Sequence, residues 1–171
     1  MIPPYTHGIF IGRFQPFHKG HYSVITDALR EKLCTKIIVV VGSMQEKGTE
    51  KNPFSYFTRK KMILASCHEL PVKVVGVPDH PDQDLLWVES VFGEIIREDP
   101  LFEKQSSILL VGEEWYAKLF EKKLTIKHVD RRLHISASRI REMITRSDQT
   151  WKALVPRGVV HVYETLKEGN L

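Results

Sequence analysis

Short, nearly continuous apolar segments that end at a glycine are the feature of the sequence that most constrains its fold. Residues 37–41 form an unbroken run of isoleucine and valine, and Gly42 follows it. Residues 8–11 and 107–111 show the same pattern, each with a glycine directly after it. A strand that is apolar on both faces is typical of a parallel sheet, because helices cover both of its sides. These runs therefore predict buried parallel strands.

Segments with apolar residues at helical spacing separate these runs. Strands are predicted at residues 8–11, 36–41, 72–77, 107–111 and 124–129. Helices are predicted at about residues 18–33, 55–65, 85–96, 114–122, 138–145 and 159–166. The alternation predicts an α/β fold, specifically a Rossmann-like, doubly wound parallel five-stranded sheet with helices on both faces. No repeat or linker divides the sequence, so we expect one domain over residues 1–171.

The composition limits the partners that the chain can have. No segment is long and apolar enough for a membrane-spanning helix or has the pattern of a signal peptide, so we expect a cytoplasmic protein without a membrane partner. The formal net charge is +4, and basic and acidic residues are interleaved. This pattern favours phosphorylated small molecules over nucleic acid. The two cysteines, Cys34 and Cys67, lie in segments with a helical pattern and are predicted to be buried, reduced thiols.

The segment after the first predicted strand is the richest in groups that suit a phosphate. In parallel sheets, ligands bind beyond the carboxyl ends of the strands. Gly12 allows close approach to the backbone there, and Pro16 stops the strand. His18 and His21 are three residues apart at a helix start, which places both rings on one side of the first turn. The helix amides and dipole favour a bound anion at the same point.

Charged and small residues around the two histidines strengthen this interpretation. Arg13 and Lys19 supply positive charge, and Gly20 leaves room for a bulky nucleotide. Alone, a histidine pair is more often a capped helix end than a binding site. A zinc site would need further cysteine or histidine ligands at close spacing, and none follows. The P-loop pattern is absent as well.

Two later features suit the same kind of ligand. Ser136 or Ser138 can cap a helix through its hydroxyl, and Arg141 can reach the same anion from the first turn. Taken alone, that segment is better explained as an ordinary capped surface helix. Trp87 follows a predicted strand and a polar loop. Its ring can stack on a flat cationic ring, or it can be a core aromatic of an amphipathic helix.

Several motifs in these segments resemble those of a known family. The stretch G-R-F-Q-P-F-H-K-G-H at residues 12–21 resembles the H-x-G-H motif of the nucleotidylyltransferase superfamily, in the longer form of the archaeal-type nicotinamide-mononucleotide adenylyltransferases. The stretch I-S-A-S-R-I-R at residues 135–141 is similar to their I-S-x-T-x-x-R element. Four further elements match in order, namely G-S-M-Q at 42–45, K-N-P-F at 51–54, L-W-V at 86–88 and W-K-A-L-V-P at 151–156. The resemblance therefore spans essentially the whole chain as a single nucleotidylyltransferase domain.

The resemblance implies roles for individual residues. The implied ATP-binding residues are Gly12, Arg13, Phe14, His18, Gly20, His21, Gly112, Ser136, Ser138 and Arg141, and His18, His21, Arg13 and Arg141 among them are the implied catalytic residues. The implied binding residues for nicotinamide mononucleotide (NMN) are Phe14, Gln15, Ser43, Asn52, Arg59 and Trp87. No protein ligand to a metal is implied, because Mg²⁺ would be held mainly by the ATP phosphates.

The implied reaction joins ATP and NMN to give NAD and pyrophosphate, in a protein whose relatives often form homo-oligomers. Two alternatives stay open: a sister transferase with another phosphate-bearing acceptor, such as nicotinate mononucleotide, FMN or pantetheine phosphate, and a nucleotide sensor without turnover. The chain also departs from the family near the acceptor. The asparagine that usually precedes Trp87 is missing, and Gln83 or Asp84 could replace it. Residues 112–113 and 129–131 resemble instead the transferase domain of bacterial multifunctional NAD regulators.

Overall fold

The computed structural model describes residues 2–129 and 133–169. Its strands are β1 (Tyr5–Gly12), β2 (Cys34–Val41), β3 (Val72–Gly76), β4 (Ser107–Val111) and β5 (Thr125–His128). Its helices are α1 (Lys19–Arg30), α2 (Tyr56–Ser66), α3 (Asp84–Glu98), α4 (Glu114–Phe120), α5 (Ala137–Thr145) and α6 (Arg157–Lys167). Two short 3₁₀ helices, η1 (Lys104–Ser106) and η2 (Gln149–Leu154), were not expected from the sequence. Every predicted strand and helix is present.

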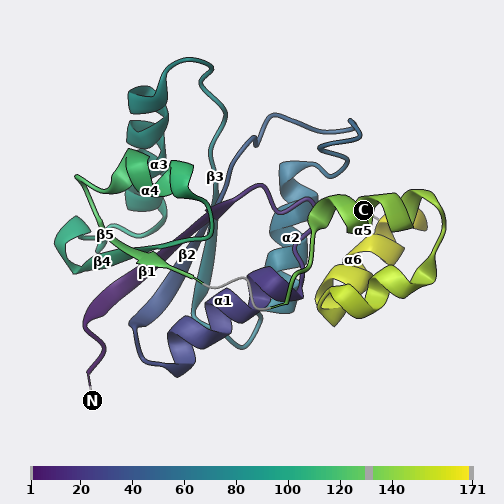
Figure 1. Cartoon of the computed structure of the whole chain (residues 1–171), viewed down its shortest axis with the longest axis horizontal. Helices are drawn as coiled ribbons and strands as arrows, with labels where there is room; N and C mark the ends of the chain where they lie inside the picture. Colours follow the sequence, from purple (N-terminus) through teal and green to yellow (C-terminus); the bar gives the residue numbers. More distant parts are fainter. Residues whose placement is uncertain (1, 130–132, 170–171) are drawn as a thin grey trace.

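The five strands form one parallel sheet in the order β3-β2-β1-β4-β5 (Figure 1). The chain adds β2 and β3 on one side of β1, then returns to place β4 on the other side, so the strand order reverses between β1 and β4. A reversal of this kind opens a crevice at the carboxyl ends of the strands, because the two flanking connections lead to opposite faces. The predicted doubly wound α/β fold is confirmed.

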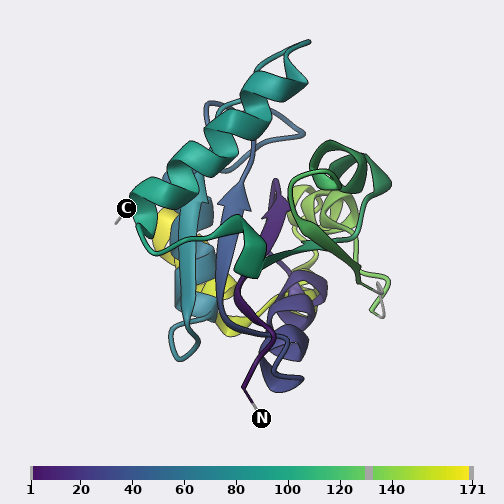
Figure 2. The ribbon, with the colours of Figure 1, turned by 90° about the vertical axis from the view of Figure 1, so that its left-hand side faces the viewer.

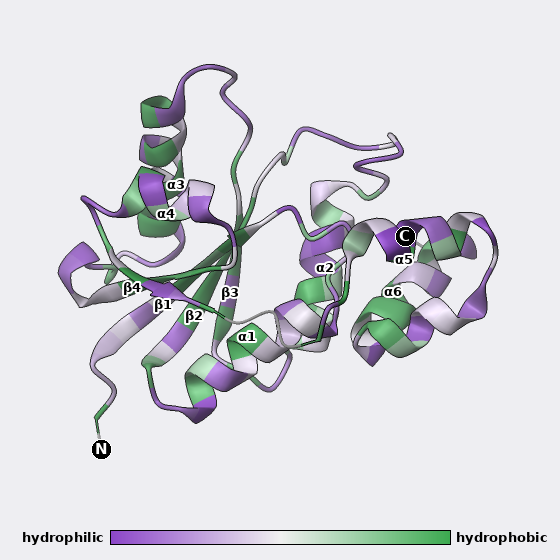
Figure 3. Cartoon of the chain, in the orientation of Figure 1, coloured by the Kyte–Doolittle hydropathy of each residue, from purple (hydrophilic) through white to green (hydrophobic). Residues whose placement is uncertain are grey.

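Alternate strand residues pack into two separate cores, one on each face of the sheet. Phe10 belongs to the core that includes residues of α1, α2, α5 and α6, whereas its neighbour Ile9 belongs to the core shared with α3 and α4. Figure 2 shows the two helix layers from the side, and Figure 3 shows hydrophobic strands within a largely hydrophilic shell of loops. Burial on both faces explains why the strands are apolar runs instead of alternating patterns.

The C-terminal helices α5 and α6 lie beyond α2, away from the edge strand β5 (Figure 1). Close approach between α6 and α2 requires Gly158, since a Cβ atom there would lie 2.5 Å from the backbone carbon of Ala65. This packing brings the start of α5 next to the motif turn after β1. In the part of the chain that the structure describes, no helix could span a membrane.

The two cysteines differ in part from the sequence prediction. Both are buried and free, as expected, and burial raises the pKa of Cys34 to about 11 and that of Cys67 to about 12. The predicted helical setting was wrong for Cys34, which is the first residue of β2. Cys67 follows the last residue of α2 as its C-cap. The prediction failed because α1 ends at Arg30, only a few residues before Cys34, so the helical pattern of the sequence runs directly into the start of β2.

Candidate nucleotide-binding site

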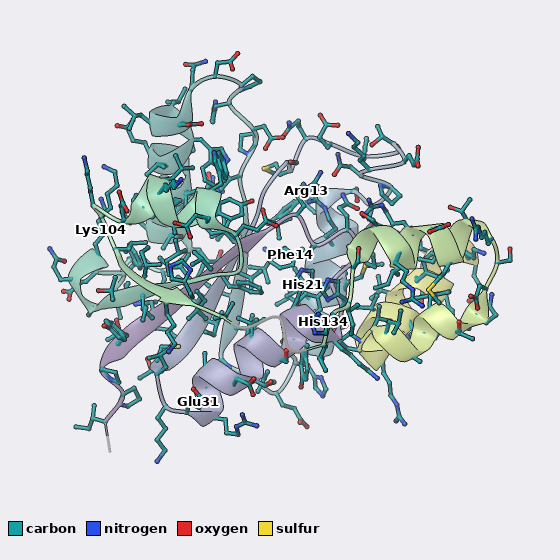
Figure 4. The ribbon with its side chains drawn as sticks, in the orientation of Figure 1. Arg13, Phe14, His21, Glu31, Lys104 and His134 are labelled. Carbon is teal, nitrogen blue, oxygen red and sulfur yellow. The ribbon has the colours of Figure 1, made fainter. Side chains whose placement is uncertain are left out.

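A cleft of about 550 Å³ opens at the reversal point between β1 and β4. One wall is formed by the turn after β1, another by Gly112, Glu113 and Tyr116, and a third by the segment that enters α5. All ten residues predicted to bind ATP line it: Gly12, Arg13, Phe14, His18, Gly20, His21, Gly112, Ser136, Ser138 and Arg141. Figure 4 shows Arg13, Phe14 and His21 following one another along this region, with His134 beside them. The ATP-binding roles of these residues stay predictions.

The two motif histidines cap the helix α1 with their own rings. The backbone N–H of His21 donates to Nδ1 of His18 at 3.3 Å, and the backbone N–H of His18 donates to Nδ1 of His21 at 3.2 Å. This is a reciprocal capping box built from imidazoles, in place of the usual hydroxyl and carboxylate. The spacing of three residues thus serves the helix end and aligns the two rings at once.

Capping also fixes which ring nitrogen can donate. Because each Nδ1 accepts a backbone N–H, it cannot carry a hydrogen of its own, so the hydrogen of the neutral ring lies on Nε2. The rings are stacked with their centroids 3.5 Å apart and their planes 20° apart. The pair therefore presents two Nε2–H donors in a fixed orientation.

Aromatic neighbours hold the His21 ring in place. Phe14 meets it edge-on at 4.9 Å between centroids, and Phe17 stacks against it at 5.7 Å. Gly20 completes the arrangement, since a Cβ atom there would lie 3.1 Å from the His18 ring. The small residue predicted to leave room for a nucleotide thus also leaves room for a histidine.

Arg141 crosses from α5 to the turn after β1. Its Nη1 donates to the carbonyl oxygen of Gln15 at 2.8 Å, its Nε to that of Glu50 at 3.0 Å, and its Nη2 to Oγ of Ser138 at 3.1 Å. Burial lowers the pKa of Arg141, and the positive charge of Arg13 lowers it further. Two like charges held near each other in a cleft favour an anion between them.

The second motif differs from its prediction in one detail. Ser136 is the N-cap of α5, as expected, but its hydroxyl makes no capping hydrogen bond. Ser138 was expected near Arg141, and the two side chains are hydrogen-bonded. Both serine hydroxyls are exposed at the cleft. Asp130 and Arg131, which resemble the NAD regulators, lie outside the described residues.

The residues predicted to bind NMN do not all meet in this cleft. Phe14 and Gln15 line it, whereas Ser43, Asn52, Arg59 and Trp87 do not. The side-chain amide of Gln15 bonds both backbone groups of Phe54, at 2.8 Å and 3.0 Å, and so joins the motif turn to the K-N-P-F segment. Asn52 is buried, and within the described structure its Oδ1 has no hydrogen-bond partner.

Trp87 and Arg59 are more deeply buried than a substrate contact would suggest. Trp87 is 6% exposed and belongs to the core under α3, and Arg59 is fully buried. Tyr116, which the sequence analysis missed, lines the cleft and stacks on Trp87 with ring centroids 5.9 Å apart. Burial, and secondarily the charge of Glu113, raises the pKa of Tyr116 to about 12. Its position one turn into the helix after Gly112 is the signal that could have identified it.

Together, a parallel sheet and a cleft at its reversal point that is lined by the H-x-G-H turn are typical of an α/β protein of the nucleotidyltransferase class. The sequence model of the cytidylyltransferase-like family matches residues 9–153. The chain belongs to this family, and the prediction of its superfamily is confirmed.

Curated relatives agree with this placement. The nicotinamide-nucleotide adenylyltransferase of Methanolobus tindarius is 30% identical over 94% of this chain and 89% of its own length. The protein of the same name from Thermococcus sibiricus is 30% identical over 94% of this chain and 84% of its own. The predicted resemblance to the archaeal-type enzymes is therefore confirmed.

A solved structure shows the same fold with ligands bound. It is a bifunctional NMN adenylyltransferase/ADP-ribose pyrophosphatase from Francisella tularensis, in complex with AMP and a manganese ion. It is 26% identical to this chain, with a TM-score of 0.72 over 83% of the chain. The present chain spans only 42% of that bifunctional protein.

Proposed function

We propose that the chain transfers the AMP part of ATP to nicotinamide mononucleotide, giving NAD and pyrophosphate. The observation that carries this proposal is the meeting of two fixed imidazole donors, His18 and His21, with Arg13 and Arg141 in one cleft. Donors and cations gathered at the start of α1 suit a triphosphate. The names of the curated relatives supply the acceptor.

The chemistry requires alignment and charge stabilisation. A phosphate oxygen of the mononucleotide attacks the α-phosphorus of ATP, and the bond from that phosphorus to the bridging oxygen of pyrophosphate breaks. The attacking oxygen is already anionic at neutral pH, so no protein base is needed. Nε2–H of His18 and His21 and the guanidinium of Arg141 stabilise the negative charge that develops on the leaving group. Because the imidazole hydrogens are fixed by the cap, these donors are oriented before substrate binds.

We propose Mg²⁺ as the metal that accompanies ATP. Among the described residues, no three histidine, cysteine, aspartate or glutamate side chains converge on a common point. Phosphate oxygens and water are the ligands that Mg²⁺ usually keeps in nucleotide sites. Its contribution would be to neutralise phosphate charge, while the protein residues orient the triphosphate.

On the acceptor side, the proposal rests on the elements shared with the family. The unpartnered Oδ1 of Asn52 is a buried acceptor that suits a hydroxyl or amide of a ligand. The aromatic pair Tyr116 and Trp87 suits a flat cationic ring, which nicotinamide is when it is joined to ribose. Nicotinate, FMN and pantetheine phosphate acceptors differ from NMN in charge or shape at this point.

The test is pyrophosphate release from ATP with a panel of acceptors: NMN, nicotinate mononucleotide, FMN and pantetheine phosphate. We expect NMN to give the highest kcat/KM and NAD to appear in equal amount with pyrophosphate. Higher kcat/KM with another acceptor would replace the substrate assignment. If calorimetry shows ATP binding but no acceptor leads to release of pyrophosphate from ATP, the result would favour a nucleotide sensor without turnover. A cytoplasmic location and a homo-oligomeric state remain predictions, the second open to light scattering.

A further inference from the structure

We propose that Arg59 is a positioning residue that holds the turns after β1 and β2 in their binding conformations, and that it does not contact the substrate. The inference rests on the proposed function, because those two turns carry residues predicted to bind ATP and NMN. It replaces the direct contact to NMN that the family resemblance implies for this residue.

The guanidinium of Arg59 donates its hydrogen bonds to backbone carbonyl oxygens. Nη1 donates to the carbonyl oxygens of Arg13 and Gly42, both at 2.8 Å, and Nη2 donates to that of Ser43 at 2.9 Å. Nε makes a longer contact of 3.4 Å to the carbonyl of Ser55 in its own helix. Four of the five N–H groups of an arginine are thus engaged. The residue is 0% exposed, so no ligand can reach it without displacing these carbonyls.

Two of the carbonyls that Arg59 binds directly precede a residue with an unfavourable backbone conformation. Phe14 has φ of 52° and Ser43 has φ of 49°, in the left-handed region that side-chain-bearing residues rarely adopt. Arg13 and Gly42 directly precede these two residues, so Arg59 bonds the peptide group that enters each left-handed turn. Such conformations persist only where the surrounding structure enforces them. One buried side chain enforces both.

Asp79 completes the connection across a third strand end. Its Oδ1 accepts from the backbone N–H and the hydroxyl of Ser43, at 3.2 Å and 3.1 Å, and its Oδ2 accepts from Nε2 of Gln45 at 3.1 Å. Burial lowers the pKa of Arg59 to about 10, and the charge of Asp79 opposes that change, so the guanidinium stays protonated at neutral pH. Cation and carboxylate act on opposite ends of the Ser43 residue and fix it from both sides.

The decisive variants are Arg59→Lys and Arg59→Met. A lysine retains the charge, but its three N–H groups sit on a single nitrogen and cannot reproduce the planar fork that binds three carbonyls from Nη1 and Nη2, whereas it can still bind a phosphate as a point charge. Positioning therefore predicts that both variants lose at least about ten-fold in kcat, the scale of a small misplacement of reacting groups. Direct contact predicts instead that Arg59→Lys stays near wild type while Arg59→Met weakens NMN binding. That second result would overturn the proposal. Arg30→Lys and Arg30→Met, at the exposed end of α1, are the matched controls.

A second readout needs no substrate and separates this proposal from the proposed function. Amide hydrogen exchange in the ligand-free Arg59→Lys variant should accelerate at residues 12–15 and 42–44 more than in the strands β1, β2 and β4. Unchanged exchange in both turns, or uniform acceleration through the sheet, would contradict a positioning role. If wild type releases no pyrophosphate with any acceptor, the proposed function fails while this exchange result still decides the role of Arg59.

Substitution of Ser43 tests the same point should the Arg59 variants fail to fold. Ser43→Gly and Ser43→Val both remove the hydroxyl that donates to Asp79. Glycine tolerates the left-handed conformation, and a β-branched residue does not. We expect kcat of Ser43→Val to be at least about ten-fold below that of Ser43→Gly. Equal kcat values for the two variants would show that the enforced turn geometry has no bearing on turnover.

Discussion

The charged side chains at the two ends of the parallel strands have different partners. We call the amino ends of the strands, with the cluster around Asp99, the closed edge, and the carboxyl ends, with the cleft, the open edge. At the amino ends of the strands, His7, Lys36 and Lys73 surround the buried carboxylate of Asp99, with nitrogen-to-Oδ2 distances of 3.2, 2.7 and 3.6 Å. Each of the three nitrogen-bearing side chains comes from a different strand, and the carboxylate joins them. The charged groups at this edge are paired with one another within the protein.

At the carboxyl ends, two arginine side chains donate to backbone carbonyl oxygens. Arg59 and Arg141 donate to backbone oxygens, and in the described residues no ion pair joins either of them, or Arg13, to an acidic side chain. Carbonyls satisfy the N–H groups but leave the positive charge in place. The closed edge therefore contributes stability, whereas Arg13 and Arg141 at the open edge keep positive charge at the cleft for an anionic ligand.

The largest expected effect lies at the open edge. We expect His18→Ala and His21→Ala each to lower kcat by about 100-fold or more, the scale of losing one transition-state donor. Each variant should also lose about 1 kcal/mol of stability, because the cap of α1 is removed. Steady-state kinetics and thermal unfolding measure the two effects separately. Turnover close to wild type in both variants would exclude the donor role.

His18→Asn separates the cap from the donor. Asparagine is a good N-cap, since its Oδ1 can accept the backbone N–H that Nδ1 of His18 accepts now. It has no donor at the position of the distal ring nitrogen. We therefore expect stability near that of wild type with the loss of kcat retained. If His18→Asn restored both the stability and the kcat of wild type, His18 would act only as a helix cap.

The next largest effect is expected from removing the carboxylate charge at the closed edge. Asp99→Asn should lower the free energy of unfolding by roughly 2 kcal/mol, below the usual cost for a fully buried pair because Lys36 and Lys73 partly reach solvent. That loss corresponds to a midpoint about 4–8 °C lower for a chain of this size. The kcat of the folded protein should not change, since the cluster lies at the opposite edge from the cleft. A large change in kcat would show that the two edges are coupled.

The same contrast explains what could be predicted from the sequence. Strands apolar on both faces and the glycines after them determine a parallel sheet, so the fold and the turn carrying His18 and His21 were accessible. Long-range contacts were not. The roles of Arg59 and Tyr116 depend on which strand ends become neighbours, and the cluster around Asp99 joins residues from four separate segments. For Arg59 and for the cluster around Asp99, nothing in the local spacing differs from an ordinary helix face or a solvated charge, whereas the position of Tyr116 soon after Gly112 was a signal that could have been used.

A third effect tests how far the open edge extends. Because Tyr116 lines the cleft and stacks on Trp87, we expect Tyr116→Ala to weaken NMN binding by about ten-fold, as for loss of one cation–aromatic contact, and ATP binding less. Trp87→Ala should weaken NMN binding in the same direction by removing the support of the Tyr116 ring. Calorimetry with each ligand measures both. Tyr116→Phe is the control, because it retains the ring. Equal weakening of ATP and NMN would refute an acceptor contact for this aromatic pair.

The smallest effect is the pH dependence of the closed edge. Burial lowers the pKa of His7, against the opposing effect of its hydrogen bond to Asp99, so the unfolded chain, with a histidine pKa of about 6.5, binds the proton more readily. Stability contributed by neutral His7 is therefore present above pH ~6.5 and is lost as pH falls through the folded pKa. The pKa of Asp99 is lowered mainly by its hydrogen bond to Lys36, so its contribution is lost only in stronger acid.

His7→Gln isolates the first of these two stages. Glutamine can still donate to Asp99 but does not titrate, so we expect a flatter stability curve between pH 7 and 5 and an unchanged loss below pH ~4. The difference in slope cannot exceed about 1.4 kcal/mol per pH unit, the value for a single proton. Urea unfolding at each pH measures it. If wild type and His7→Gln lose stability in parallel from pH 7 to 5, other histidines control that range and the closed edge is insensitive to pH until Asp99 is protonated.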